Sequence, residues 1–133
     1  FWTGTGNTQM MADVIAAAIN AAGAEAVVKN VSEITADEAA GYAALALGCP
    51  AMGAEVLEEC EFEPFFTELE GKLAGKKVAL FGSYGWGGSY MQDWEARVKD
   101  AGAELVAAGV LALGAPDDEA EAKLAEAGKL LAE

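Results

Sequence analysis

Hydrophobic residues in this chain alternate between helical spacing and short unbroken runs. One helical face begins at Met11 and ends before Gly23, which stands where a C-terminal cap is expected. Residues 43–47 and 78–81 are continuous apolar runs, a pattern typical of strands that are buried on both faces. The pattern therefore predicts strands that alternate with helices.

The remaining segments extend this alternation. Pro64 suits the first turn of a helix, and the spacing of Ser89 and Gln92 forms a capping box for another helix, which places Trp94 in the core. The further elements are expected at residues 26–31 (strand), 35–39 (start of a helix), 64–73 (helix), 89–101 (helix), 104–111 (strand) and 116–131 (helix).

Such an alternation argues for a parallel sheet with helices on both faces, in one domain that spans residues 1–133. Ligands of these sheets bind at the carboxyl ends of the strands. Three loops, at residues 3–8, 50–55 and 83–88, are expected to converge there.

Composition narrows the function. The formal net charge of -14, from 22 acidic and 8 basic residues, disfavours binding to nucleic acid or anionic membranes and favours cationic protein partners. The chain has two cysteines, no histidine and no apolar run long enough to span a bilayer. We expect a reduced cytoplasmic protein with structural cysteines, no catalytic residues and no metal site.

The loop at residues 3–8 carries glycines and hydroxyl groups but no basic residue. A nucleotide-hydrolysing P-loop would need lysine after Gly6, where Asn7 stands, and the dinucleotide fingerprint would need a third glycine at Gln9. Neutral donors at a helix N-terminus still favour an anion, and a phosphate monoester fits. The alternative is a plain turn with a helix cap.

Three segments, TGTGNT, GCPAMGAEVLEE and FGSYGWG, resemble the short-chain flavodoxins over nearly the whole chain. The resemblance implies a doubly wound, five-stranded parallel sheet of order 2-1-3-4-5, the order known for flavodoxins, in a three-layer sandwich. It also implies non-covalently bound FMN. The chain would shuttle single electrons between redox partner proteins at low potential, without being an enzyme.

The resemblance also implies roles for individual residues. Residues 3–8 would bind the FMN phosphate, and Met52 and Trp86 would pack on opposite faces of the flavin ring. Gly53 would offer its carbonyl to flavin N5 on reduction, and Glu55 would accept a hydrogen bond from flavin N3. The complete set of expected FMN contacts is Trp2, Thr3, Gly4, Thr5, Gly6, Asn7, Thr8, Pro50, Ala51, Met52, Gly53, Ala54, Glu55, Ser83, Tyr84, Gly85, Trp86 and Gly87.

The chain departs from the family pattern in two places. Pro50 stands where some relatives have a hydroxyl residue that contacts the phosphate. The chain starts at Phe1, where the family has a first strand that is central in the sheet. We therefore expect the first strand to be largely absent from this sequence, the domain to be incomplete at its N-terminus, and the ladder edges of two neighbouring strands to be unpaired.

Two other functions use the same topology. An FMN-dependent NAD(P)H or quinone reductase is the closest alternative, although it would need longer loops to build a substrate pocket. A phosphoacceptor signalling domain would need acidic residues where Gly48, Cys49 and Pro50 follow the strand at residues 43–47. We expect a monomer with basic redox partners.

Overall fold

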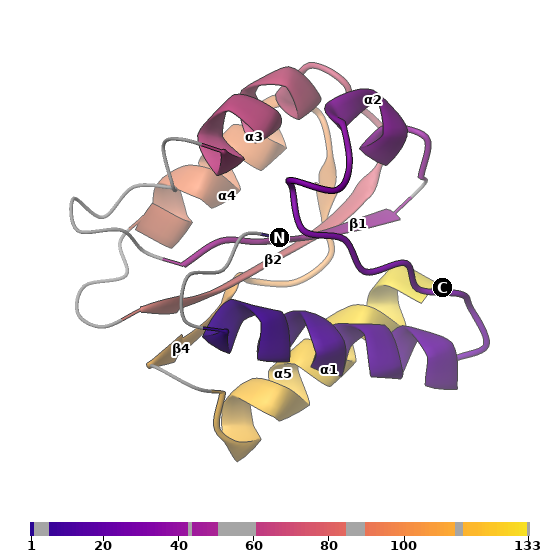
Figure 1. Ribbon diagram of the computed structural model, residues 1–133, viewed down its shortest axis with the longest axis vertical. Helices are drawn as coiled ribbons and strands as arrows, with labels where there is room; N and C mark the ends of the chain where they lie inside the picture. Colours follow the sequence, from indigo (N-terminus) through magenta and orange to yellow (C-terminus); the bar gives the residue numbers. More distant parts are fainter. Residues whose placement is uncertain (2–5, 43, 51–60, 85–89, 114–115, 133) are drawn as a thin grey trace.

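The computed structural model describes residues 1, 6–42, 44–50, 61–84, 90–113 and 116–132. A parallel sheet forms the middle layer, with α2, α3 and α4 on one face and α1 and α5 on the other (Figure 1). The elements are α1 (Asn7–Ala21), α2 (Ala36–Ala39), β1 (Ala44–Gly48), α3 (Phe62–Glu70), β2 (Lys77–Tyr84), α4 (Tyr90–Asp100), β3 (Glu104–Leu105), β4 (Val110–Leu113) and α5 (Asp118–Ala132).

β2 is the centre of the sheet. β1 pairs with one edge of β2 in parallel, with Gly48 opposite Phe81. Both β3 and β4 pair with β2 in parallel, Glu104 opposite Lys77 and Val110 opposite Phe81. The α/β class with a parallel open sheet is therefore confirmed. β1 and β2 correspond to the third and fourth strands of the expected order, and β3 and β4 together correspond to the fifth.

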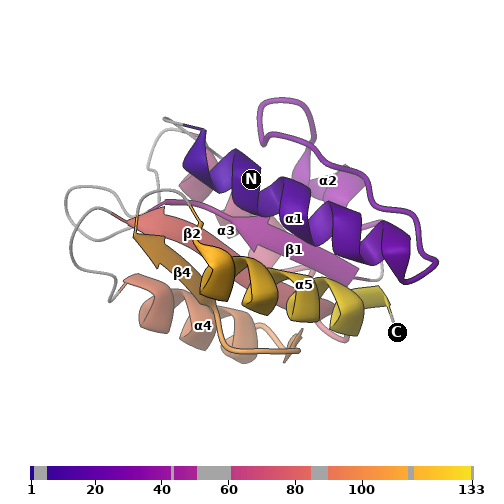
Figure 2. The same ribbon diagram turned by 90° about the horizontal axis from the view of Figure 1, so that it is seen from below.

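Alternation along the strands divides the core into two clusters. Leu45 and Leu47 of β1 face α3 and α4, whereas Ala44 and Ala46 face α1 and α5. This is the period of two that a pleated strand imposes on its side chains. Figure 2 shows α1 and α5 side by side beneath the sheet.

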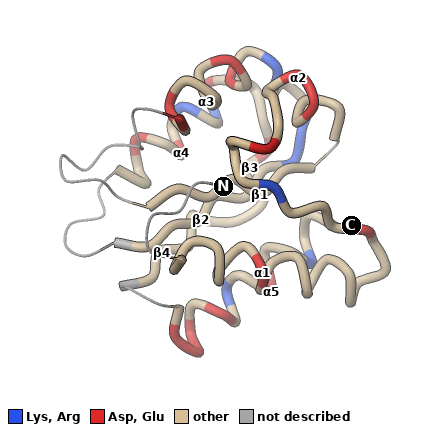
Figure 3. The backbone as a smooth tube through the Cα atoms, viewed as in Figure 1, with Lys and Arg blue, Asp and Glu red and all other residues tan. Residues whose placement is uncertain are grey.

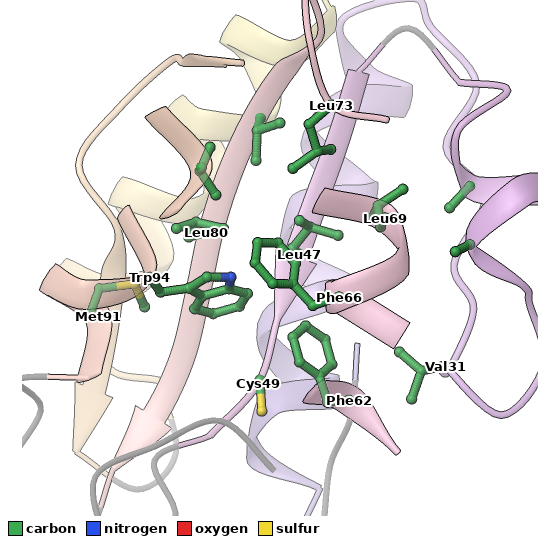
Figure 4. Packing of buried hydrophobic residues seen from close by; sticks show 14 of the residues in the cluster. Val31, Leu47, Cys49, Phe62, Phe66, Leu69, Leu73, Leu80, Met91 and Trp94 are labelled. Atoms are coloured by element: carbon green, nitrogen blue, oxygen red, sulfur yellow. The ribbon is translucent and has the colours of Figure 1, made fainter. Parts of the chain in front are cut away.

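The cluster beneath α3 and α4 is aromatic (Figure 4). Phe62 and Phe66 present their rings to the edge of Trp94, at centroid distances of 5.4 and 5.9 Å. Arg97 lies 4.7 Å above the ring of Phe66, and its guanidinium donates hydrogen bonds to Glu63 and Glu70. The expected core position of Trp94 is confirmed.

The opposite cluster mixes alanines with larger residues such as Met11, Phe81 and Leu124. Gly128 lies where α5 crosses α1, and a Cβ there would come within 2.8 Å of the Ile15 carbonyl oxygen. α1 and α5 therefore approach closely because this position has no side chain.

The expected strand at residues 26–31 is not formed, so that prediction is wrong. Val27 and Val28 are exposed. Two backbone hydrogen bonds join residues 26–31 to Phe1. The Val31 N–H donates to the Phe1 carbonyl, and the Phe1 ammonium donates to the Lys29 carbonyl. A strand needs a partner along its length, and among the described residues of other segments only Phe1 forms backbone hydrogen bonds with this run.

A cavity of about 310 Å³ lies between residues 24–29, α1 and β1. Ala44 and Ala46 line it, and the described residues give β1 no ladder partner on this side. The first three residues of β1 are consequently only half-buried, although the apolar run predicts full burial.

Several local signals are confirmed. Gly23 adopts a φ of 94° just after α1, and Gly102 a φ of 87° after α4. Thr35 forms a capping box with Glu38 at the start of α2. The single strand expected at residues 104–111 is wrong, because β3 and β4 are separated at residues 106–109. The Ser89 capping box lies outside the described residues.

Candidate functional site

The carboxyl ends of β1, β2 and β4 point to the same edge of the sheet, on the left of Figure 1. The amino end of α1 reaches this edge from below the sheet. This edge is where ligands of parallel sheets bind. The described residues of the three expected loops therefore meet at one place.

The amino end of α1 is built to leave its first turn open. Gly6 precedes the helix with a φ of 93°, a left-handed conformation that costs glycine little, and no side chain among the described residues caps the first amides. The first turns of α2, α3, α4 and α5 all carry carboxylates, but that of α1 carries none. The positive end of this helix dipole is therefore not neutralised by a carboxylate of its own first turn.

Thr8 and Ser83 form a buried pair of hydroxyl groups beside this first turn. The Thr8 Oγ1 and Ser83 Oγ atoms are 3.3 Å apart, although 75 residues separate them in the chain. Thr8 is 1% exposed and Ser83 is 6% exposed. The structure thus brings together two residues that the sequence placed in different loops.

Ser83 and Tyr84 lie in β2, opposite Ala112 and Leu113 of β4, and not in a loop. The prediction of a loop from Gly82 onward is wrong for these residues, because ladder pairing with β4 extends β2 beyond residue 81. Ser83 therefore occupies a fixed position on a central strand.

Sequence reasoning missed a junction between β1, β2 and α4. The hydroxyl of buried Tyr90, the first residue of α4, donates a 2.8 Å hydrogen bond to the Cys49 carbonyl. A Cβ at Gly82 would collide with both of these oxygen atoms. Burial raises the pKa of Tyr90 well above its usual range, so the hydroxyl keeps its proton. The sequence did offer one signal for this junction: Tyr90 lies one helical turn before Trp94, so it is expected to face inward as well.

Cys49 is buried, and its thiol donates to the carbonyl of the half-buried Pro50. Its amide donates to the Phe81 carbonyl, which continues the β1–β2 ladder to the carboxyl edge. Pro50 therefore stands at the expected edge of the sheet. The remaining expected contacts lie outside the described residues: Trp2, Thr3, Gly4, Thr5, Ala51, Met52, Gly53, Ala54, Glu55, Gly85, Trp86 and Gly87.

Acidic residues are spread over the described surface, and some of them lie near the carboxyl ends of the strands (Figure 3). The amino ends of α3, α4 and α5 bring acidic residues to the carboxyl edge, among them Glu63, Asp93 and Asp118. Five of the eight basic residues lie toward the amino ends of the strands, in the α3–β2 connection, at the start of β2 or in the last turns of α4 and α5: Lys72, Lys76, Lys77, Lys99 and Lys129. The amino ends of α4 and α5 thus bring acidic residues to the side of the candidate site.

Within the described residues, no cluster of three acidic or cysteine side chains is arranged to hold a metal ion. No helix in the described part of the chain is long and apolar enough to cross a membrane.

Comparison with known proteins identifies the family. The flavodoxin family model matches residues 1–128. A flavodoxin of Clostridium beijerinckii is 49% identical over 133 residues, which cover 99% of this chain and 96% of that protein. A flavodoxin of Megasphaera elsdenii is 47% identical, over 92% of this chain and 90% of that protein.

The solved structures agree. The solution structure of two-electron reduced Megasphaera elsdenii flavodoxin matches with a TM-score of 0.91 and 45% identity, over 99% of this chain and 95% of that chain. Flavodoxins carry electrons on FMN between redox partners and are not enzymes. None of these findings favours the reductase alternative. The chain belongs to the flavodoxin family and is an FMN-binding electron carrier.

Proposed function

We propose that the amino end of α1 binds the phosphate of FMN. The observation that carries this proposal is the contrast between α1, whose first turn is Asn7, Thr8 and Gln9, and the other helices, whose first turns are acidic. The first amides of a helix have no acceptor within the helix, and the dipole favours negative charge at that end. A dianionic phosphate satisfies both without a basic side chain.

The described residues fit this group. Gly6 can adopt its positive φ without strain, and no atom lies within 4 Å of where its Cβ would be. The buried hydroxyls of Thr8 and Ser83 add donors beside the first turn. Thr3 and Thr5, with the amides of the same loop, are proposed to complete the phosphate site.

The flavin ring is proposed to lie between Met52 and Trp86, with Gly53 and Glu55 at its polar edge. FMN, when bound, supplies the one-electron chemistry, and the protein orients the ring and sets its potential. Negative charge around the carboxyl edge would oppose further negative charge on the reduced ring. We therefore propose a low-potential carrier.

The phosphate proposal is tested by placing a negative charge in the first turn of α1. Asn7→Asp changes no heavy-atom count but adds a carboxylate beside the proposed phosphate, so FMN affinity should fall about tenfold or more at low salt. Riboflavin, which has no phosphate, should bind as in the wild type. Fluorescence-quenching titrations measure both affinities.

Asn20→Asp is the matched control, because it makes the same substitution near the far end of α1. Its Oδ1 accepts from the Ala26 N–H, and a carboxylate can accept the same bond. FMN affinity should stay within about twofold of the wild type, since the charge is four turns from the proposed site. Equal losses of FMN affinity in the two variants would contradict the phosphate proposal.

We propose that the chain is a cytoplasmic monomer whose partners are redox proteins with basic docking faces. The acidic amino ends of α3, α4 and α5 surround the edge at which the flavin would be exposed. Complementary charge steers association over about 8 Å at physiological ionic strength. Electron transfer to a cationic reductase should slow as salt is added, and a rate that rose steadily with ionic strength would contradict this part.

A further inference from the structure

The Thr8–Ser83 pair ends the apolar layer between α1 and β2. The inward-facing residues Met11 and Ile15 of α1 are buried and apolar, as is Phe81 of β2. One turn earlier on α1 and two residues later on β2, the same faces change to Thr8 and Ser83. Both hydroxyls are therefore buried at the carboxyl edge, beside the first turn of α1.

Burying a hydroxyl group is unfavourable unless it is hydrogen-bonded. The 3.3 Å contact provides one hydrogen bond for the pair. Each hydroxyl has one proton to donate, so a pair that shares one bond has one proton left for another acceptor. The structure thus holds a spare donor next to the amino end of α1.

An anion decides which hydroxyl donates outward. Thr8 belongs to the first turn of α1, whereas Ser83 lies on the central strand behind it. A phosphate oxygen can only accept, so Thr8 would donate to it, and Ser83 would then donate to Thr8 Oγ1. A donor that itself accepts a hydrogen bond is polarised, and its own bond is strengthened.

We propose that Ser83 is a positioning residue for the phosphate site, which orients and polarises the Thr8 hydroxyl toward the FMN phosphate and does not contact the flavin ring. This inference rests on the proposed function, since it needs the phosphate at the amino end of α1. It makes the role of Ser83 specific, since the family resemblance placed this residue only among the general FMN contacts. The hydrogen bond between Thr8 and Ser83 would then serve ligand binding as well as the packing of α1 on β2.

The test is a double-mutant cycle with Ser83→Ala and Thr8→Val, read as separate affinities for FMN and riboflavin. Ser83→Ala should weaken FMN binding about fivefold, the effect of losing one neutral hydrogen bond, and should leave riboflavin binding within about twofold. Thr8→Val should weaken FMN binding more, about tenfold, because it removes a bond to a charged group. In the Thr8→Val background, Ser83→Ala should have no further effect.

Tyr90→Phe is the matched control. It also removes one buried hydroxyl hydrogen bond at the carboxyl edge, but that bond goes to Cys49 and not to Thr8. The ratio of FMN to riboflavin affinity should therefore stay at the wild-type value in Tyr90→Phe. Thermal unfolding of each variant shows how far stability itself has changed.

Three results would overturn the inference. Equal weakening of FMN and riboflavin by Ser83→Ala would place Ser83 against the ring or the ribityl chain. If Ser83→Ala weakened FMN binding as much in the Thr8→Val background as in the wild type, Ser83 would not act through Thr8. If Ser83→Ala bound FMN with the wild-type affinity, the Thr8–Ser83 hydrogen bond would have a structural role and no role in phosphate binding. If the wild type itself failed to prefer FMN over riboflavin, the proposed function would fail instead.

Discussion

The two faces of the sheet are packed in different ways. On one face, Trp94 and the rings of α3 form an aromatic cluster, and Arg97 joins α3 to α4 through Glu63 and Glu70. On the other face, alanines and Gly128 let α1 and α5 lie close together, with a cavity of about 310 Å³ beside β1.

This difference in packing leads us to infer that the aromatic face contributes mainly to stability, while the α1 side carries the proposed phosphate site. The described members of the proposed phosphate site, Gly6, Thr8 and Ser83, all belong to the α1 side. Large rings fill space and fix the position of the sheet, whereas small residues let the amino end of α1 reach the edge of β2. Substitutions on the aromatic face should therefore change stability without changing the preference for FMN over riboflavin.

The largest expected effect is that of Trp94→Ala. Trp94 is 1% exposed and contacts both Phe62 and Phe66 edge-on, so removing it leaves a cavity in the middle of the cluster. The free energy of unfolding should fall by about 3 to 5 kcal/mol, measured by urea denaturation. A fall below about 1 kcal/mol would mean that the aromatic face does not hold the fold.

The next effect concerns the close packing of the α1 side. Gly128→Ala should lower the free energy of unfolding by about 1 to 3 kcal/mol, because its Cβ would come within 2.8 Å of the Ile15 carbonyl oxygen. Gly71→Ala is the control, since Gly71 has a φ of -73° and open space around the Cβ position. If both variants were as stable as the wild type, α1 and α5 would not be closely packed.

The Arg97 interactions predict a pH dependence. The Arg97 guanidinium lowers the pKa of Glu63, so the unfolded state binds this proton more tightly than the folded state. The stabilisation is complete above the usual glutamate pKa of 4.5 and is lost as the pH falls through the lower folded value. Arg97→Gln should cost about 1 kcal/mol at pH 7, and less at pH 3.

Lys123→Gln is the control for this ion pair. Lys123 pairs with Glu119 on the surface of α5, where both side chains are more than half exposed. Its removal should cost less than about 0.5 kcal/mol at pH 7 in the same denaturation experiment. If Arg97→Gln and Lys123→Gln lowered the free energy of unfolding equally, the hydrogen bonds of Arg97 would stabilise the fold no more than an exposed ion pair does.

The smallest effect distinguishes the cavity from the packed part of the same face. Ala46 lines the cavity, whereas its register partner Ala79 is 2% exposed within the packed cluster. Ala46→Val should raise the free energy of unfolding by about 0.5 to 1 kcal/mol by filling space, and Ala79→Val should lower it by overpacking. Thermal melts of the two variants that moved in the same direction would contradict this difference.

Sequence reasoning predicts the parts of this fold that depend on neighbouring residues. The helical face from Met11, the helix start at residues 35–39 and the stop at Gly23 are predicted from local signals, and each is found in the structure. The run at residues 26–31 has the right composition for a strand but forms none, because pairing is a property of two segments.

The candidate site shows the same limit. Family resemblance assigns both Thr8 and Ser83 to the FMN site. Nothing in the sequence around either residue predicts their hydrogen bond, because they are 75 positions apart. The Tyr90–Cys49 bond was missed for the same reason, as was the need for glycine at position 82. Such contacts depend on the register of β1 and β2, which is set by the packing of the whole sheet.

The central claim is that FMN is held mainly through its phosphate at the amino end of α1. The most direct measurement is a pair of fluorescence-quenching titrations of the wild type, one with FMN and one with riboflavin. FMN should bind at one site per chain and about 100-fold more tightly, since the hydrogen bonds to a charged phosphate together contribute about 3 kcal/mol. Equal affinity for FMN and riboflavin would contradict the account.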